Sequence, residues 1–263
     1  MTRCVLVTGA GSGIGEACAL RLASQGWQVA LVGRRAEALE RVAQICGGLV
    51  LAGDAAHSST WDSFIARLRE RFGGLDAVIA CAGGHGLGRA DQTSDDAWRE
   101  ALRVNLDSAF HTARACLPLL RERRGSLVLL GSIASLAAGP EVCGYTTAKH
   151  ALVGLTRSLA RDYGPFGVRV NCVCPGWVRT PMADQEMQPL MDHFQEDLDA
   201  AYRRVTADVP LRRPASSVEI AAVCQFLVSA EASIVTGAVI TADGGSTVVD
   251  VPTLAYARLE QPA

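Results

Sequence analysis

The chain has 263 residues, of which 49% are hydrophobic and 20% charged, so it can bury a sizeable core, and a disordered or fibrous protein is excluded. The formal net charge is −2 with both signs mixed along the chain, so we expect neither a nucleic-acid nor a membrane partner. Neither a signal peptide nor an apolar run long enough to span a bilayer is recognisable, which predicts a cytoplasmic protein.

Short apolar segments alternate with longer amphipathic segments along the whole chain. The apolar segments predict strands at residues 5–8, 29–32, 49–52, 77–80, 127–131 and 169–173, with a seventh at 238–241. The amphipathic segments predict helices at residues 14–25, 36–46, 60–72, 95–120, 144–163 and 217–229. Near-continuous apolar strands separated by helices indicate a parallel sheet covered on both faces. We therefore expect a doubly wound, Rossmann-like α/β fold with seven strands, formed as one domain by residues 1–263.

The first strand runs directly into the sequence Thr8-Gly-Ala-Gly-Ser-Gly-Ile-Gly15, and a helix follows. Glycines allow a tight turn and a close approach to a pyrophosphate, and the helix N-terminus offers free N–H groups. The spacing GxxxGxG differs from the general fingerprint GxGxxG, and a flexible turn is the alternative. The turn predicts a dinucleotide site that includes Gly9, Ser12, Gly13, Ile14 and Gly15.

The end of the second strand bears on the choice of cofactor. An acidic residue at this place binds ribose hydroxyls and excludes a 2′-phosphate, but this chain has Gly33 followed by Arg34 and Arg35. Guanidinium groups suit phosphate recognition, so we favour NADP(H), with NAD(H) possible. The alternative is that both arginines only begin the next helix in solvent. Asp54, after the third strand, could accept a hydrogen bond from the adenine amine or could be a turn aspartate.

Tyr145 and Lys149 lie four residues apart in a predicted helix, which places both side chains on one face. An ammonium beside a phenol favours the phenolate, so such a tyrosine can give a proton to a carbonyl oxygen and take it back. Lys149 is the one lysine among 25 basic residues, which indicates a position that arginine cannot fill.

Two further polar residues are candidates for the same site. Ser132 follows the strand at 127–131, at the edge where ligands bind, and could hold a substrate oxygen; Ser135 is its competitor, and a simple cap is the alternative. Asn105 lies within the predicted helix 95–120, where asparagine is mildly unfavourable. We expect it to hold a water, to break the helix or to be a satisfied surface residue.

The nine cysteines contain no CxxC pair, so we expect no disulfide framework and no metal site, and most of them should be small buried hydrophobes. Cys143 is the exception to watch, because it lies two residues before Tyr145.

Over nearly its whole length the chain resembles the short-chain dehydrogenase/reductase family. The resemblance is carried by the motifs 8–15, Asp54, Ala82-Gly83, Asn105, Ser132, Tyr145-xxx-Lys149, Asn171, Pro175-Gly176, Thr180 and Asp243-Gly244-Gly245. It implies a catalytic tetrad of Asn105, Ser132, Tyr145 and Lys149, in which the lysine also binds the nicotinamide ribose and the asparagine holds a water. Further cofactor contacts are implied for Ala82, Gly83, Pro175, Gly176, Val178 and Thr180.

The resemblance also implies a homotetramer built on the helices at 95–120 and 144–163. One position departs from the family. Cys81 stands where the family usually has an asparagine that braces the central sheet, which puts local rigidity and adenosine-side contacts in doubt.

The predicted activity is the interconversion of a carbonyl and a secondary alcohol by hydride transfer. We expect the substrate between residues 84–89, 134–143 and a lid at about 177–205, and we favour a small or medium apolar molecule. The apolar residues of the lid could instead form the core of the lid itself. Three alternatives stay open: a 3-oxoacyl-thioester (acyl-carrier-protein) reductase, an epimerase or dehydratase with tightly held nicotinamide, and a non-catalytic dinucleotide sensor.

Overall fold

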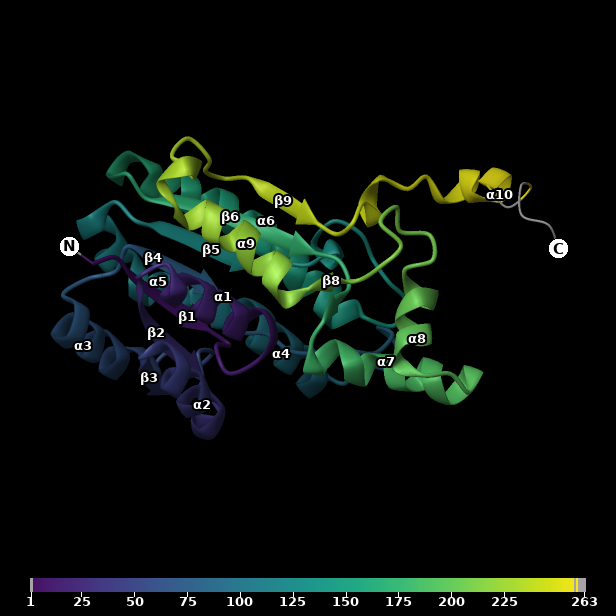
Figure 1. The fold of residues 1–263 in the computed structure, drawn as a ribbon, viewed down its shortest axis with the longest axis horizontal. Coiled ribbons are helices and arrows are strands. Elements are labelled where there is room, and N and C mark those ends of the chain that lie inside the picture. The colour runs from purple at the N-terminus through teal and green to yellow at the C-terminus, as the bar shows by residue number, and fades with distance from the viewer. Residues whose placement is uncertain (1, 258, 260–263) are drawn as a thin grey trace.

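The computed structural model describes residues 2–257 and residue 259. A seven-stranded parallel sheet has the order β3-β2-β1-β4-β5-β6-β9 and forms the centre of the molecule (Figure 1). The strands are β1 (Cys4–Thr8), β2 (Gln28–Gly33), β3 (Leu49–Ala52), β4 (Ala77–Ala80), β5 (Ser126–Leu130), β6 (Arg169–Pro175) and β9 (Val239–Ala242). This is the predicted doubly wound, Rossmann-like fold, with each strand within two residues of its expected bounds. The order reverses at β1, so the crevice for a ligand lies where β1 and β4 end.

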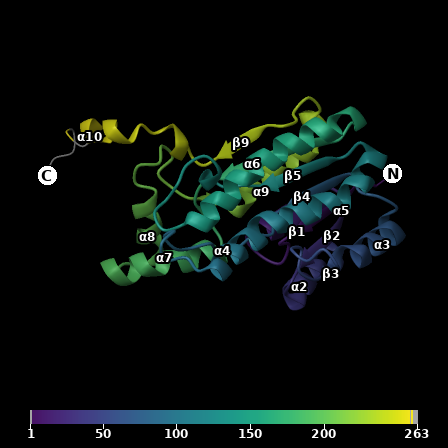
Figure 2. The ribbon, with the colours of Figure 1, turned by 180° about the vertical axis from the view of Figure 1, so that it is seen from behind.

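Helices cover both faces of the sheet. One face carries α1 (Gly13–Ser24), α2 (Ala36–Cys46) and α9 (Ser217–Val228), which lie in front of the sheet in Figure 1. The other carries α3 (Thr60–Phe72), α5 (Ser108–Arg123) and α6 (Cys143–Tyr163), which lie in front in Figure 2. Successive residues of a strand point to opposite faces. Leu6 accordingly packs in the core under α3, α5 and α6, whereas Val5 and Val7 pack under α1, α2 and α9. Burial on both faces explains why the strands are apolar throughout.

The prediction of one continuous helix at 95–120 is wrong, because the helix is interrupted. The segment consists of α4 (Asp95–Leu102), a π-helical turn over Arg103–Asp107 and then α5. Asn105 lies within this turn, and its Nδ2 donates to the carbonyl of Ala101, four residues earlier, at 3.1 Å. A side chain that bonds the backbone of the preceding turn competes with the regular ladder. Single π turns of this kind are frequent at functional sites.

The predicted lid, 177–205, contains the short strand β7 (Val178–Arg179), α7 (Pro181–Phe194) and α8 (Leu198–Val205). β7 pairs with β8 (Ala215–Ser216), a second sheet that the sequence did not predict. Met187 and Tyr202, both 1% exposed, pack together between α7 and α8. These two side chains therefore form the core of the lid rather than the lining of a pocket, which was the alternative considered for this segment.

The chain ends in α10 (Leu254–Ala257), which lies away from the rest of the fold in both views (Figures 1 and 2). Short 3-10 turns occur at Ile133–Ser135, Gly164–Phe166, Ala230–Ala232, Ser246–Val248 and Val251–Thr253. Among residues 2–257 and 259, no helix is long and apolar enough to cross a membrane.

Candidate active site

The turn between β1 and α1 has the geometry of a phosphate-binding loop. Gly9 and Gly13 have φ angles of +66° and +56°, a left-handed conformation that suits glycine. A Cβ at Gly15 would lie 2.3 Å from the carbonyl oxygen of Gly9, so the turn and the first turn of α1 touch backbone to backbone. Ser12 is the N-cap residue of α1, and its side chain makes no capping bond, which leaves the N–H groups of the first turn free for an anion. The residues present therefore fit a dinucleotide pyrophosphate.

The segment that follows β6 reaches this turn from the other side. A Cβ at Gly13 would lie 3.1 Å from Cγ2 of Thr180, so these two predicted cofactor residues are neighbours. Thr180 also caps α7, because its Oγ1 accepts a hydrogen bond of 3.2 Å from the N–H of Ala183. At Gly176 a Cβ would lie 3.0 Å from Cα of Asp243, which requires a small residue there. Pro175 and Val178 lie on either side, both buried.

The end of β4 is tied to the end of β1. The N–H of Ala82 donates to Oγ1 of Thr8 at 3.0 Å. A Cβ at Gly83 would lie 3.0 Å from Oδ1 of Asn105 and 3.7 Å from Nζ of Lys149. Asn105 and Lys149 therefore border the same space beside Gly83, although they come from different helices. Thr8 begins the glycine-rich motif read from the sequence, but no role was predicted for its hydroxyl.

The two arginines after β2 are both exposed. The Arg35 guanidinium donates to Oγ of Ser12 at 3.0 Å, which places it over the glycine-rich turn. For Arg34, the part of the chain that the structure describes supplies no hydrogen-bond or ion-pair partner, so its guanidinium is available to a ligand. Ile14, the other predicted residue of this turn, is half-buried against the core under α1.

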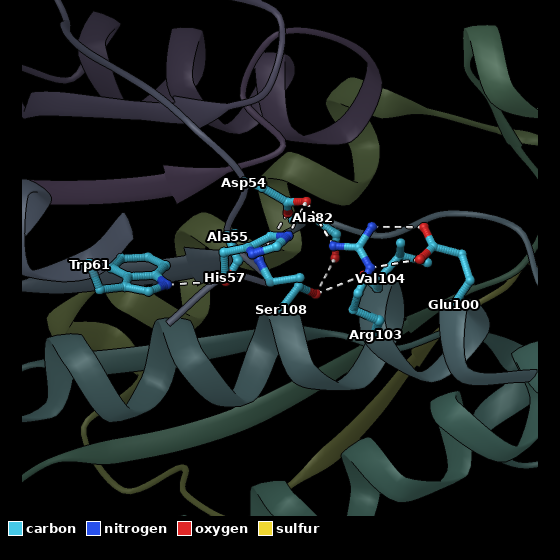
Figure 3. Close-up of polar contacts among 10 residues, drawn as sticks. Asp54, Ala55, His57, Trp61, Ala82, Glu100, Arg103, Val104 and Ser108 are labelled. Atoms are coloured by element: carbon cyan, nitrogen blue, oxygen red, sulfur yellow. Dashed lines mark hydrogen bonds and ion pairs between the residues drawn. The ribbon is translucent and has the colours of Figure 1, made fainter. Parts of the chain in front are cut away.

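Asp54 lies in the polar cluster shown in Figure 3. Its carboxylate accepts from the N–H of Ala56 at 3.0 Å and from Nη1 of Arg103 at 2.8 Å, and Arg103 also binds Glu100. Burial acts to raise the pKa of Asp54, but the Ala56 N–H and the Arg103 guanidinium outweigh it and hold the pKa below its usual range. Asp54 therefore forms a turn through the N–H of Ala56, which is the alternative that the sequence left open. It is also bound to Arg103, 49 positions later, a contact that the sequence did not suggest.

The predicted acid/base pair lies on the first two turns of α6. Lys149 is 5% exposed, and its Nζ donates to the carbonyl of Leu130 at 2.9 Å and lies 5.5 Å from the centre of the Tyr145 ring. Leu130 is two residues before Ser132, so this bond fixes the lysine beneath the turn that carries the serine. The compact ammonium thus donates to a single backbone carbonyl, a contact for which the fork of a guanidinium is not needed.

The two serines after β5 differ in exposure. Ser135 is 2% exposed, and its Oγ accepts from the N–H of Ser132 at 3.2 Å. Ser132 is less buried, and its Oγ accepts from the N–H of Ala134 at 3.1 Å, so the hydroxyl hydrogen can still be donated. Of the two, Ser132 is the serine that a substrate can reach.

Asn105 is 1% exposed and connects the π-helical turn to the loop after β4. Besides Ala101, its Nδ2 donates to the carbonyl of His85 at 3.4 Å, and its Oδ1 accepts from the N–H of Gly84 at 3.2 Å. Both amide hydrogens are therefore used, and one lone pair on Oδ1 remains for a water. Asn105 fixes the backbone beside Tyr145 as well as offering this one acceptor.

Cysteines line the floor of the site. A Cβ at Gly131 would lie 2.8 Å from Sγ of Cys172 and 2.9 Å from Sγ of Cys174, so the strand end passes close over two buried thiols. Cys81, the departure from the family pattern, is half-buried and contacts the thiol of Cys18 in α1. A sulfur contact to α1 occupies the place where an asparagine was expected to brace the sheet.

Two segments that were expected to enclose a substrate come together above Tyr145. The N–H of Tyr145 donates to the carbonyl of Gly86 at 3.2 Å, and a Cβ at Gly86 would lie 2.6 Å from that nitrogen. Gly88 pairs with the segment before α6, donating to the carbonyl of Glu141 at 2.7 Å. His85, in the same loop, bonds to Glu186 of α7 at 2.9 Å. Both residues lie in segments expected to enclose the substrate, 84–89 and 177–205, but neither was singled out from the sequence.

Comparison with known proteins finds similarity over nearly the whole chain. A family model described as Enoyl-(Acyl carrier protein) reductase matches residues 9–247. The chain is 51% identical over 258 residues to Protein MoaE of Klebsiella aerogenes, covering 98% of this chain and 100% of the relative. It is 35% identical over 249 residues to meso-2,3-butanediol dehydrogenase of Serratia marcescens, covering 94% and 95%.

A solved structure of the same fold contains a nicotinamide cofactor. L-sorbose reductase from Gluconobacter frateurii, complexed with NADPH and L-sorbose, superposes with a TM-score of 0.87 at 28% identity and covers 93% of this chain and 96% of that one.

Proposed function

The chain belongs to the short-chain dehydrogenase/reductase family and is an NAD(P)-dependent oxidoreductase that interconverts a carbonyl and an alcohol, and we propose that Tyr145 is its acid/base. The observation that carries this proposal is the position of Lys149: the one lysine of the chain is buried, bound to the carbonyl of Leu130, and 5.5 Å from the centre of the Tyr145 ring. The charge of this ammonium stabilises negative charge that develops on the Tyr145 oxygen during proton transfer.

Each polar residue has a distinct part in the reaction. The nicotinamide, when bound, supplies or accepts the hydride. The Tyr145 hydroxyl gives a proton to the carbonyl oxygen in reduction and removes it from the alcohol in oxidation. The Ser132 hydroxyl donates to the same oxygen and stabilises charge that develops there. Lys149 holds the nicotinamide ribose, and Asn105 holds the loop after β4 and a water on Oδ1.

For the cofactor we propose NADP(H) over NAD(H). Arg34 is exposed and makes no hydrogen bond or ion pair with the described residues, although its charge acts on the Asp54 and Glu100 carboxylates, and Arg35 lies over the glycine-rich turn at Ser12. Guanidinium groups in this place suit a 2′-phosphate, and the strand ends in Gly33 instead of an acidic residue that would repel it. The pyrophosphate would lie on Gly9, Gly13 and the N-terminus of α1. Asp54 would keep a lone pair for the adenine amine.

The remaining cofactor contacts follow from the segment after β6. Thr180, next to Gly13, and Val178 would contact the nicotinamide carboxamide, with Pro175 and Gly176 forming the turn that leads there. Ala82 and Gly83 would contact the adenosine and nicotinamide riboses. We propose further that residues 1–263 act as one cytoplasmic domain with a lid at about 177–205. The expected assembly is a homotetramer on α4, α5 and α6.

The substrate class is a small carbonyl or alcohol compound, not a carrier-bound thioester or a nucleic acid. A phosphopantetheine clamp would need cations near the lid, and two arginines that flank the expected substrate segments are each paired with a carboxylate. Arg89 pairs with Asp91 at 3.6 Å, and Arg179 pairs with Asp199 while stacking 4.5 Å from the Tyr202 ring. The meso-2,3-butanediol dehydrogenase and L-sorbose reductase relatives are named for small oxygenated substrates.

The test measures turnover of a panel of ketones, secondary alcohols and acyl-thioesters. The reaction is monitored by the absorbance of the nicotinamide, with NADPH and NADH supplied in separate reactions. Turnover of ketones and alcohols, faster with NADPH, is expected. Tyr145→Phe should lower kcat/KM by about 10²–10⁴ and leave cofactor affinity within a few-fold, since only proton transfer is lost. The matched control is Tyr163→Phe, the same change at the far end of α6, which should leave kcat/KM unchanged.

Three outcomes would contradict the proposal. Full activity in Tyr145→Phe would remove the acid/base assignment. Turnover restricted to acyl-thioesters would select the 3-oxoacyl-thioester reductase. Cofactor binding without any turnover across the panel would favour a dinucleotide sensor.

A further inference from the structure

A polar pair joins the loop after β4 to the lid. Nδ1 of His85 lies 2.9 Å from Oε1 of Glu186, a residue of α7 that is 101 positions later in the chain. The two side chains are 41% and 33% exposed, so the pair is reachable from solvent but is not freely solvated. A pair of this kind contributes little to stability by itself. The pair is of interest because it connects the loop after β4 to α7 of the lid.

The backbone of His85 is fixed by the residues that we propose carry out the chemistry. Its carbonyl accepts a hydrogen bond from Nδ2 of Asn105, and the next carbonyl, that of Gly86, accepts one from the N–H of Tyr145. On either side of His85 the loop has glycines, and neither Gly84 nor Gly86 has room for a Cβ without close contacts to Val104 or Tyr145. Between these two glycines His85 supplies the side chain of this stretch, and its backbone is held by Asn105 one residue before the carbonyl that binds Tyr145.

Each partner keeps hydrogen-bonding capacity. Within the part of the chain that the structure describes, Nε2 of His85 and Oε2 of Glu186 have no hydrogen-bond partner. A carboxylate can only accept, so Nδ1 of His85 donates to Glu186 and the ring is oriented with Nε2 left to bind a hydroxyl. Oε2 of Glu186 is a second acceptor for the same kind of group. Both atoms suit a ligand that carries an alcohol.

We infer that His85 and Glu186 form a subsite for a second oxygen of the substrate, so that the enzyme acts on hydroxyketones and diols in preference to simple ketones and alcohols. This inference rests on the proposed function, in which Tyr145 and Ser132 hold the reacting oxygen. The subsite is formed by two of the three segments expected to enclose the substrate, residues 84–89 and the lid, and it replaces the apolar preference expected from the sequence. Leaving a built hydrogen-bonding site unpaired is the general way in which an enzyme rejects an analogue that lacks one hydroxyl.

The test uses two pairs of compounds that differ by one hydroxyl group: 3-hydroxy-2-butanone against 2-butanone for reduction, and 2,3-butanediol against 2-butanol for oxidation. We expect the wild-type enzyme to have a higher kcat/KM for the hydroxyl-bearing member of each pair. His85→Phe keeps a planar ring without nitrogen atoms and should lower kcat/KM about tenfold for the hydroxyl-bearing member, the effect of losing one hydrogen bond, and less than about twofold for the other. His85→Gln, which keeps an acceptor, should restore part of the preference.

A control and a binding measurement separate the roles of the pair. Gln185→Ala, an exposed neighbour on α7, should leave both members of each pair unchanged. NADPH affinity should be unchanged in every variant, which shows that the fold and the cofactor site are intact. The same selective loss is expected for Glu186→Gln, though smaller, because an amide oxygen still accepts.

The outcomes are distinct. Equal loss for both members in His85→Phe, or a wild-type enzyme with no preference within either pair, would overturn the subsite and leave the proposed function standing. Absence of turnover for all four compounds, with NADPH bound, would overturn the subsite together with the small-ketone activity.

Discussion

Replacing Gly15 by alanine tests whether the turn after β1 forms the cofactor site. A Cβ at this position would lie 2.3 Å from the carbonyl oxygen of Gly9, 2.7 Å from its carbonyl carbon and 3.1 Å from the oxygen of Thr8. All three atoms belong to the backbone, so no side chain can rotate away. The first separation would have to grow by at least 0.7 Å, from 2.3 to 3.0 Å, before reaching values that Cβ atoms show.

The displaced oxygen belongs to the residue that starts the turn, Gly9, whose φ angle of +66° is already in the left-handed region. Overpacking that forces a backbone shift costs about 2–3 kcal/mol. If that cost falls on the cofactor-bound geometry, the Kd for NADPH rises roughly 30- to 150-fold, at about 1.4 kcal/mol per tenfold. If it falls on the free protein as well, the Tm also drops, by roughly 2–4 °C for each kcal/mol in a protein of this size.

The assay is titration of NADPH fluorescence together with thermal unfolding. Gly154→Ala is the matched control for the Kd, because it adds the same methyl group to α6, where no atom of this chain lies within 4 Å of the new Cβ; since α6 is also proposed to pack in the homotetramer, the oligomeric state of this variant is checked as well. It should leave the Kd for NADPH within about twofold, as expected of a surface change. A Gly15→Ala variant with the Kd and Tm of the wild type would refute the argument that this turn binds the pyrophosphate.

Two further substitutions test the part of the proposed cofactor site that would hold the adenosine. Arg34→Ala should weaken NADPH about 10- to 150-fold, the range for a hydrogen bond to a charged group, and NADH by only a few-fold; equal losses in fluorescence titrations would mean that Arg34 does not contact the 2′-phosphate. Arg103→Gln should reduce the free energy of unfolding by about 1 kcal/mol at pH 7. Because the pKa of Asp54 is lowered in the folded state, its stabilising effect is present above its unfolded pKa, about 4, and is lost as pH falls through the folded pKa. Urea unfolding should therefore show the difference between Arg103→Gln and wild type shrinking from pH 7 to pH 3, and a difference that stays constant would contradict the role of the Asp54–Arg103 pair.

The fold was predictable because its signals are local. Each strand is a short apolar run, since both faces of the sheet are buried, and each helix carries the period of a half-buried surface. The same holds for the glycine-rich turn and for Tyr145 and Lys149, whose spacing of four residues puts them on one helical face. The π-helical turn at Arg103–Asp107 was not predictable in this way. Asparagine in a helix signals only a conflict with the ladder, and the shape of the break depends on where the loop at Gly84 and His85 packs.

The sequence by itself determined the order of the elements, and it predicted the turn that would hold a pyrophosphate and the residues proposed to exchange a proton, because these depend on residues within one turn or one strand of each other. Only the tertiary structure decided which distant groups meet: the carbonyl of Leu130 under Lys149, Arg103 on Asp54, and Glu186 on His85. Those contacts depend on how strands are ordered in the sheet and where each helix ends over it. Packing across the whole domain sets the strand order and the positions of the helix ends, and no short stretch of sequence encodes that packing.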